Sequence, residues 1–280
     1  SKSIPPLRVE TDTTLREEEN YPQIWMMNEA SSLSTKEEVK SWDKKLSEAL
    51  SNTDTHDSHN QKKIVQLNKQ DEEKSQSLPL SEAILWRGST RRFARKSISL
   101  AKLSGILYSS TRGVPLGILT QSREMKEMEI SLADIYLIAN EVDGLASGSY
   151  FFNTQENALE QLKLGNFRDV SSYLCLEQPL FGDASAVLFL MADLQSTLES
   201  LGNRGYRLAQ FEAGIVAGKI YVSSYSLKLG ASGSTFYDDA VTEFFSPHAS
   251  RKNTMIAVGI GVPDYKTRQG RILVGNLSRA

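Results

Sequence analysis

The feature that most constrains the fold is a run of six apolar residues at 186–191, with the sequence AVLFLM. Such a run predicts a strand that is buried on both faces, because no polar residue alternates with the apolar ones. Two more strands, at 134–139 and 255–260, are predicted from similarly apolar segments. A sheet of such strands needs helices on both faces. Because helices and strands intermix without a regular alternation, we predict an α+β fold with a mixed central sheet surrounded by helices.

Two helices are predicted from the spacing of their apolar residues. The first begins after Ser99, a good N-cap residue. Its apolar residues share one face: Leu100, Leu103, Ile106 and Leu107. The second helix spans about 206–229 and contains Gly214 and Gly218, four residues apart. This spacing leaves one helix face nearly bare, which predicts tight packing of another helix and would also serve a contact between subunits.

A helical turn at 81–86 leads into residues 87–93, RGSTRRF, which hold three arginines and two hydroxyls. Guanidinium groups, hydroxyls and turn amides donate the charge-assisted hydrogen bonds that a phosphate accepts. Arg87, Ser89 and Arg91 are therefore candidate contacts for the phosphate and sugar chain of a cofactor. The alternative is a solvated arginine cluster that interacts with the carbonyls at a helix end.

A second candidate segment lies far downstream, at Gly230, Ala231, Ser232 and Gly233. Its glycines predict a loop whose backbone approaches a ligand closely and whose amides stabilise negative charge. The alternative is a helix C-cap at Gly230. Taken together, the two segments predict a phosphorylated cofactor held between remote parts of the chain.

Charge and cysteine content narrow the classes of partner and location. The chain has 280 residues, 32 basic and 34 acidic side chains and a net charge of −2, which argues against nucleic-acid binding. It has no apolar run of about 18 residues, so no membrane span is predicted. Cys175 is the single cysteine and cannot form an internal disulfide, which favours a reducing, cytoplasmic location. Its apolar neighbours predict a buried structural thiol.

Composition divides the chain into an N-terminal extension at 1–79 and a compact domain at 80–280. Residues 21–27 carry an apolar and aromatic patch that predicts a strap lying on a folded surface. A polar helix is predicted to begin near Ser34, and residues 51–60 read as a solvated linker.

Five short motifs resemble those of the nitroreductase-like flavin fold, and specifically its SagB-type dehydrogenase branch. The resemblance covers about 80–265 and is strong because the motifs occur in the family's order and spacing. Residues 87–93 resemble the opening Arg-Arg-Ser-x-Arg-x-Phe, and 142–150 resemble a V-D-G-L-x-x-G-x-Y hairpin. Residues 204–214 are similar to a helix at the family's dimer interface, and 229–239 to its glycine loop and acidic turn.

The resemblance implies an FMN-dependent oxidoreductase that works as a homodimer, with NAD(P)H or the substrate as reductant and hydride passing through flavin N5. The substrate would be a small molecule or a peptide. Arg87, Ser89 and Arg91 would contact the phosphate and ribityl chain, and the Gly230–Gly233 segment the ring system. Lys266 and Arg268 resemble a Lys-x-Arg phosphate contact, with a plain charged tail as the alternative. No residue stands out as a general base.

Two departures from the family pattern bear on function. The branch's Pro-Ser-x-Gly-x-x-x-Pro segment is missing between Gly113 and Asp134. Ser200 and Leu201 stand where azoline-oxidising members carry Lys-Tyr, which disfavours azoline oxidation. Both departures resemble the second copy of tandem SagB-type proteins. They leave open a flavin-free scaffold that binds a peptide or partner enzyme, or a heterodimer with a catalytic copy.

Other groups of polar residues are weaker candidates for a site. Four residues could chelate a metal by type, but they lie in a low-complexity linker without a rigid frame, so no metal site is predicted: Asp54, His56, Asp57 and His59. His248 follows Ser246-Pro247 and is typical of turn chemistry. The 259–261 segment lacks the third glycine of a dinucleotide-binding fingerprint.

Overall fold

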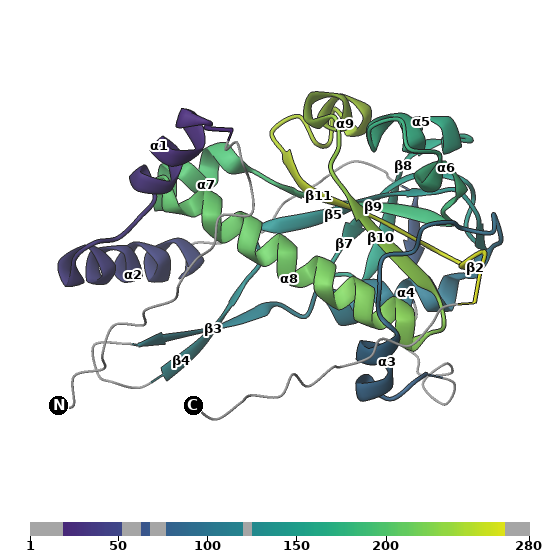
Figure 1. Cartoon of the computed structure of the whole chain (residues 1–280), viewed down its shortest axis with the longest axis horizontal. Coiled ribbons are helices and arrows are strands. Elements are labelled where there is room, and N and C mark those ends of the chain that lie inside the picture. The colour runs from purple at the N-terminus through teal and green to yellow at the C-terminus, as the bar shows by residue number, and fades with distance from the viewer. Residues whose placement is uncertain (1–18, 52–62, 68–76, 120–124, 267–280) are drawn as a thin grey trace.

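The computed structural model describes residues 19–51, 63–67, 77–119 and 125–266 (Figure 1). A seven-stranded sheet with the order β1-β8-β7-β5-β9-β11-β10 forms its centre. The strands of this sheet are β1 (Ile64–Gln66), β5 (Ala133–Ala139), β7 (Gly148–Asn153), β8 (Ala158–Leu164), β9 (Ala186–Ala192), β10 (Gly230–Ser234) and β11 (Asn253–Gly261). Two small pairs lie outside it, namely β2 (Ile98–Ser99) with β6 (Val142–Asp143) and β3 (Val114–Leu119) with β4 (Met125–Ile130).

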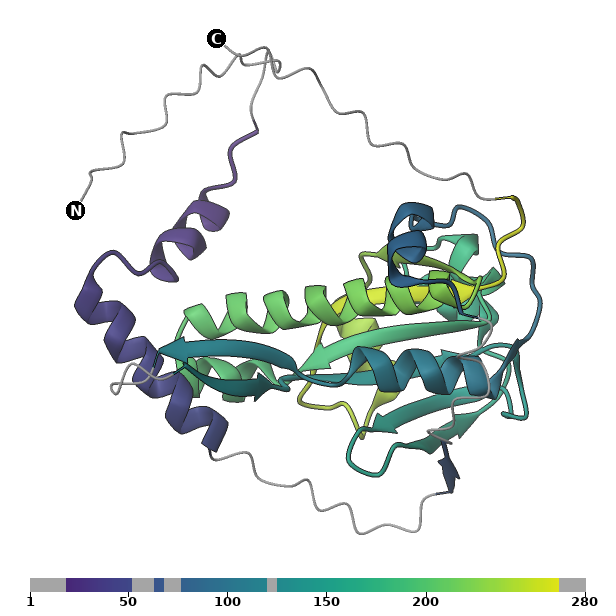
Figure 2. The ribbon, with the colours of Figure 1, turned by 90° about the horizontal axis from the view of Figure 1, so that it is seen from below.

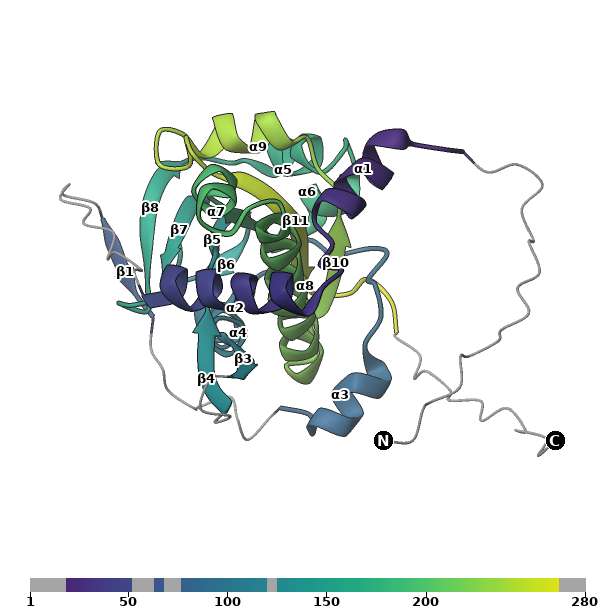
Figure 3. The same ribbon diagram turned by 90° about the vertical axis from the view of Figure 1, so that its left-hand side faces the viewer.

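Helices cover both faces of the sheet, which confirms the predicted α+β class (Figure 3). One face packs against α4 and α8, and the other against α5, α6 and α9. The described helices are α1 (Pro22–Ala30), α2 (Lys36–Ser51), α3 (Leu80–Trp86), α4 (Leu100–Ser110), α5 (Arg168–Leu174), α6 (Pro179–Asp183), α7 (Leu194–Leu201), α8 (Arg204–Ser226) and α9 (Asp238–Phe245). Among them, none is both long and apolar enough to cross a bilayer.

The strand β9 confirms the prediction made from the apolar run. All seven of its residues are buried. Leu188 and Leu190 point into the core beneath α4 and α8, while Val187, Phe189 and Met191 point to the opposite core. A strand filled on both faces in this way needs no polar alternation.

The central sheet is antiparallel throughout, so the predicted mixed sheet is corrected in this detail. The long helix α8 connects β9 to β10, an arrangement that would suit a parallel crossover. However, β11 inserts between β9 and β10 and pairs antiparallel with both. The strands β9 and β10 are therefore not neighbours and form no parallel pair, and the parallel pair β2–β6 lies outside the central sheet.

The helix α4 follows the sequence prediction closely. The Ser99 hydroxyl accepts a hydrogen bond from the Lys102 backbone N–H at 3.2 Å, which makes it the N-cap. Leu103, Ile106 and Leu107 are fully buried against the sheet. The apolar spacing therefore identified the buried face correctly.

The helix α8 crosses almost the whole molecule, with the β3–β4 hairpin beside its N-terminal half (Figure 2). The predicted packing of another helix on Gly214 and Gly218 is wrong within the described chain. A Cβ added at either glycine would meet no atom within 4 Å, because both face outward. The other expectation from this spacing, a contact between subunits, remains a prediction.

The helices α1 and α2 lie at the N-terminal end of α8 (Figure 3). From α2, Trp42 donates its indole N–H to the Leu201 carbonyl at 3.3 Å, and Leu46 is buried with Leu201 and Leu208. The prediction that residues 21–27 lie with their apolar side chains against a folded surface is corrected for α1, because these side chains are exposed. Their exposed fractions run from 54% to 68% at Tyr21, Ile24, Trp25 and Met26.

Glu212 is a buried carboxyl on α8 that anchors the start of β5. Its carboxylate accepts hydrogen bonds from the backbone N–H groups of Leu132, at 2.7 Å, and Ala133. Burial raises the pKa of Glu212 from 4.5 to about 7, because loss of hydration outweighs these two hydrogen bonds.

We expect Glu212 to make unfolding pH-dependent. The pKa of Glu212 is higher in the folded chain than in the unfolded chain, so the folded chain keeps the carboxyl proton to a higher pH. The free energy of unfolding therefore falls as the pH rises from about 4.5 to 7. Glutamine does not titrate, so this loss is absent in Glu212→Gln. The free energy of unfolding of the variant should therefore rise by about 3 kcal/mol relative to that of the wild type between pH 4.5 and pH 8. Denaturant titrations at pH 4.5 and pH 8 measure it. The exposed Glu199→Gln is the control, and a constant Glu212→Gln difference would refute the prediction.

Candidate functional site

Three segments that are far apart in sequence meet at the edge of the sheet formed by β10. They are residues 87–93, β10 itself and residues 262–266. The Thr90 backbone N–H donates to the Ala231 carbonyl at 2.8 Å, which fixes the arginine stretch beside β10. The Asp264 N–H donates to the Arg92 carbonyl at 3.0 Å, and the Arg91 N–H donates to the Tyr265 hydroxyl at 3.1 Å. The sequence prediction that two remote segments come together is confirmed, and a third segment joins them.

Thr90 lies at the centre of this junction and is fully buried. Its Oγ1 lies 3.2 Å from the Tyr225 hydroxyl on α8. A Cβ at Gly230 would overlap Thr90 Oγ1 and approach Pro263 Cγ to 3.0 Å. Gly230 therefore permits close packing inside the chain, which is a different role from the predicted approach to a ligand.

The predicted Gly230–Gly233 loop is wrong as secondary structure, since these residues form strand β10 in antiparallel register with β11. Gly230, Ala231 and Ser232 are buried, and Gly233 is exposed. The alternative C-cap at Gly230 is also wrong, because α8 ends at Ser226. Pairing with the apolar β11 extends this segment, an effect that its glycine content alone could not indicate.

Tyr221 of α8 is a site residue that the sequence reasoning missed. Its hydroxyl accepts a hydrogen bond from the Gly233 backbone N–H and lies 3.5 Å from Ser89 Oγ. It therefore contacts both predicted segments at once. The available signal was its spacing of four residues from Tyr225, which places both rings on one face of α8.

The arginine stretch presents positive charge that no carboxylate in the described part of the chain neutralises. Arg87, Arg91 and Arg92 are exposed and pair with no carboxylate among the described residues. Lys266 is exposed next to Tyr265, whereas Arg268 falls outside the described residues. By contrast, Arg95, two residues after this stretch, forms an ion pair with Asp183.

These donors suit a phosphate group. Two guanidinium groups, the Ser89 hydroxyl and the Lys266 ammonium all lie on the converging segments, and a phosphate accepts from all of these types. Fewer residues are available to contact a flavin ring than the sequence suggested, because only Gly233 of the four predicted ring contacts is exposed. Its N–H is already held by Tyr221.

The β3–β4 hairpin occupies the place of the missing Pro-Ser-x-Gly segment. It starts at Val114, directly after Gly113, whose carbonyl accepts a hydrogen bond from Lys219 Nζ at 2.6 Å. At the other departure, Leu201 is the last residue of α7 and is buried in the cluster with Leu46 and Leu208, whereas Ser200 is exposed. At this second departure, Leu201 therefore has a packing role in the chain.

The remaining candidate residues have different surroundings in the structure. Cys175 is buried and burial raises the pKa of its thiol to about 12, which confirms the predicted inert thiol. His248 does more than make a turn, since its Nδ1 lies 2.9 Å from the Tyr136 hydroxyl and its Nε2 3.9 Å from a Glu160 carboxylate oxygen. The four candidate metal ligands at 54–59 fall outside the described residues.

Residues 84–262 match the nitroreductase family. The chain belongs to that family. It is an oxidoreductase enzyme, and the matched region runs from α3 to the end of β11, so it includes most of the converging segments. The resemblance stated from the sequence is confirmed at the level of the family.

Relatives and solved structures agree with this membership. The nitroreductase-type protein MJ1384 of Methanocaldococcus jannaschii is 26% identical over 173 residues, which cover 60% of this chain and 84% of that protein. A nitroreductase-type structure from Anabaena variabilis has a TM-score of 0.67 at 23% identity and covers 92% of this chain. This chain spans only 50% of the Anabaena chain.

Two other solved structures share the fold at lower similarity. A nitroreductase-type protein from Ralstonia eutropha has a TM-score of 0.55 at 20% identity, covering 72% of this chain and 90% of that one. The E. coli microcin synthetase McbBCD complex has a chain with a TM-score of 0.52 at 15% identity, covering 78% of this chain and 81% of its own. At such identities these likenesses show the fold alone.

Gly230 provides a test of the junction between Thr90 and β10. Gly230→Ala should lower the free energy of unfolding by about 1–3 kcal/mol, because its Cβ would overlap Thr90 Oγ1. Gly105→Ala on the exposed face of α4 is the control and should be neutral or stabilising, since its nearest neighbour would be 4.0 Å away. Denaturant titration measures both variants. Equal stability of the two would show that the segments are not packed as described.

Proposed function

We propose that this nitroreductase-family chain is an FMN-dependent oxidoreductase of the SagB-type branch. The observation that carries the proposal is the convergence of Arg87 and Arg91, which pair with no carboxylate among the described residues, with β10 and the segment that ends at Lys266. FMN is the cofactor that family membership supports, and its phosphate suits these donors.

The residues of the junction divide the work of binding in this proposal. Arg87, Arg91 and Lys266 neutralise the phosphate, and Ser89 donates a further hydrogen bond. Bound FMN supplies two-electron chemistry by hydride transfer at N5, with NAD(P)H or the substrate itself as the reductant. Tyr221 holds Gly233 and Ser89 at a fixed separation, so that both segments present one surface to the cofactor.

A small molecule or a peptide is the proposed substrate class. The McbBCD structure was solved with truncated pro-MccB17 bound, and its related chain supports a peptide as one option. Azoline oxidation is disfavoured for this chain, because Ser200 and Leu201 stand in the positions of the Lys-Tyr pair. Ser200 is not basic, and the Leu201 side chain is buried.

A homodimer is the proposed assembly. The face of α8 that carries Gly214, Gly218 and Phe211 is open, and Phe211 is 53% exposed. The uncovered apolar residues of α1 lie at the N-terminal end of the same helix. Burial of this surface against a second copy would remove apolar area from water and let two α8 helices approach closely at the glycines. The double length of the Anabaena chain is consistent with a paired arrangement.

We propose the boundary near residue 79 as a division between an extension and the family domain, and not between two independent domains. The extension packs on the domain through Trp42 and Leu46. It also supplies β1, which pairs with β8 at the edge of the central sheet. Its described parts therefore share the domain's sheet and core.

A flavin-free scaffold that binds a peptide or a partner enzyme is the second candidate. The burial of Gly230, Ala231 and Ser232 favours it, because these residues offer less open backbone than the family resemblance implies. The β3–β4 hairpin in place of the Pro-Ser-x-Gly segment favours it as well. A heterodimer with a catalytic copy would be a variant of this candidate.

Flavin content distinguishes the two candidates and tests the phosphate contacts. The purified protein should release FMN on denaturation, and Arg87→Ala or Arg91→Ala should each weaken FMN binding by about 1–3 kcal/mol through loss of charge-assisted bonds. Arg95→Ala is the matched control, because Arg95 lies two residues after the stretch and is paired with Asp183. Fluorescence titration of apoprotein with FMN measures all three. A colourless protein that takes up no FMN would leave the scaffold.

The open face of α8 gives a test of the dimer. Gly218→Trp should weaken self-association at least tenfold and leave the monomer folded, because a Cβ at Gly218 meets nothing in the chain itself. Sedimentation velocity over a range of concentrations measures the association, and circular dichroism the fold. Ala101→Trp, at an exposed position of α4, is the control. Unchanged self-association of Gly218→Trp would place the contact elsewhere.

A further inference from the structure

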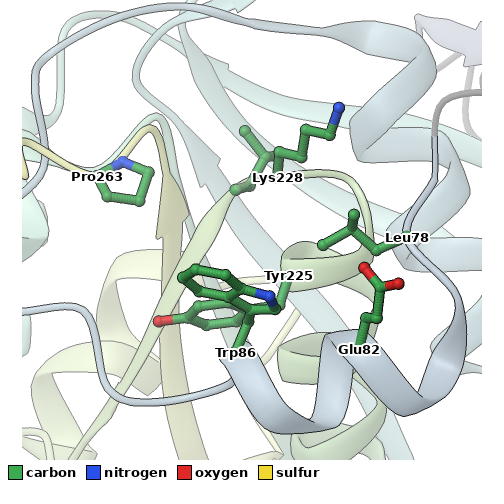
Figure 4. Close-up of a pocket in the computed structure, with 7 residues that line it drawn as sticks. Leu78, Glu82, Trp86, Tyr225, Lys228 and Pro263 are labelled. Atoms are coloured by element: carbon green, nitrogen blue, oxygen red, sulfur yellow. The ribbon is translucent and has the colours of Figure 1, made fainter. Parts of the chain in front are cut away.

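A cavity of 340 Å³ lies between α3, the C-terminal end of α8 and the residue Pro263 after β11 (Figure 4). Its walls are formed by Leu78, Glu82, Trp86, Tyr225, Lys228, Leu229 and Pro263. None of these residues is a proposed contact of the FMN phosphate or ring. The cavity adjoins the cofactor site, since Trp86 precedes Arg87 and the Tyr225 hydroxyl lies 3.2 Å from Thr90 Oγ1.

The cavity walls combine an apolar surface with three polar groups that have no partner in the described chain. Tyr225 and Leu229 are buried residues of the main core, and Trp86 packs against that core. The Trp86 indole N–H, the Lys228 ammonium and the Glu82 carboxylate make no hydrogen bond or ion pair with any described residue. Lys228 and Glu82 line the same cavity but lie too far apart for an ion pair.

Lys228 occupies a backbone position that favours glycine. The Leu229 N–H donates to the Ser224 carbonyl at 2.8 Å and the Lys228 N–H to the Tyr225 carbonyl at 3.1 Å, so α8 ends in a Schellman motif. Lys228 adopts the left-handed conformation of that motif, with φ of 59°. Glycine adopts this conformation without the steric cost that a Cβ brings. The lysine therefore carries a steric cost at this place that glycine would avoid.

We propose that the cavity binds a free α-amino acid with an apolar side chain. The ligand carboxylate would accept from Lys228 and the Trp86 indole N–H, and its ammonium group would lie against Glu82. Its side chain would pack on Tyr225 and Leu229. The volume is near the lower end of the range of about 300–1,000 Å³ for small-molecule pockets, which restricts the ligand to a compact molecule. This site is separate from the proposed FMN site and does not rest on the proposed function.

The required charges are tested with a matched set of ligands. Isothermal titration of the full chain with L-leucine should give saturable binding. Two analogues each lack one charged group: 4-methylpentanoic acid has no amino group, and 3-methylbutylamine has no carboxylate. Each should bind at least about tenfold more weakly, as expected for one lost charge-assisted contact. Equal binding of 4-methylpentanoic acid and L-leucine would overturn the role of Glu82, and no saturable binding of L-leucine or L-phenylalanine would overturn the site.

Two variants separate the ligand contacts from structural effects. Lys228→Gly should bind L-leucine at least about tenfold more weakly while its melting temperature stays the same or rises, because glycine suits the left-handed position. Glu82→Gln should weaken L-leucine binding and leave 4-methylpentanoic acid binding unchanged. Lys102→Met on α4 is the control, because Lys102 does not line the cavity. Wild-type affinity in Lys228→Gly would overturn the proposal.

The cavity and the cofactor site are distinguished by competition. Saturating FMN should leave the affinity for L-leucine unchanged within about threefold, because the proposed contacts share no residue. Displacement of L-leucine by FMN would assign the cavity to the cofactor site and overturn a separate amino-acid site. Flavin content is measured independently, so failure of the FMN proposal is not confused with failure of this one.

Discussion

The site of this protein depends on the closure of residues 87–93 onto the edge of β10. Thr90 holds the two segments together, because its backbone N–H donates to the Ala231 carbonyl and its buried hydroxyl forms a hydrogen bond with the Tyr225 hydroxyl. A buried polar side chain is tolerated there only because its hydrogen bond is satisfied. Gly230 supplies the space for it, and the neighbouring arginines lie at the surface with no carboxylate partner in the part of the chain that the structure describes. Packing in the centre of the stretch thus determines where its charge is presented.

The helix α8 joins the separate parts of the molecule. One face fills the core above the sheet, and the buried Glu212 on it anchors the start of β5. Tyr221 and Tyr225 reach the arginine stretch from its C-terminal half, where the end of the helix also forms a wall of the cavity. The glycine face stays open for a second copy in the proposed dimer. A single helix thereby connects the core, the cofactor site and the proposed interface.

Membership of the nitroreductase family gives the chain its enzyme class, and the departures from the family pattern define what is particular to it. The β3–β4 hairpin stands where the resemblance places a segment with flavin contacts. Leu201, which is buried, stands in the position of the Lys-Tyr pair of azoline-oxidising members. The buried residues of β10 narrow the backbone surface available to a flavin ring. The residues of the proposed phosphate site that the structure describes are all exposed, namely Arg87, Ser89, Arg91 and Lys266. The proposed phosphate contacts are therefore more accessible to a ligand than the proposed ring contacts.

The sequence alone determined the elements whose patterns are local. The apolar run of β9, the N-cap at Ser99 and the order of family motifs were sufficient to predict the α+β class, the family and the arginine stretch. Only the tertiary structure decided the conformation of Gly230–Gly233, since pairing with β11 converts a glycine-rich loop into a strand. It also decided the role of Tyr221 and the opening of the Gly218 face. These outcomes depend on contacts between residues distant in sequence, and hydrophobic periodicity carries no information about such contacts.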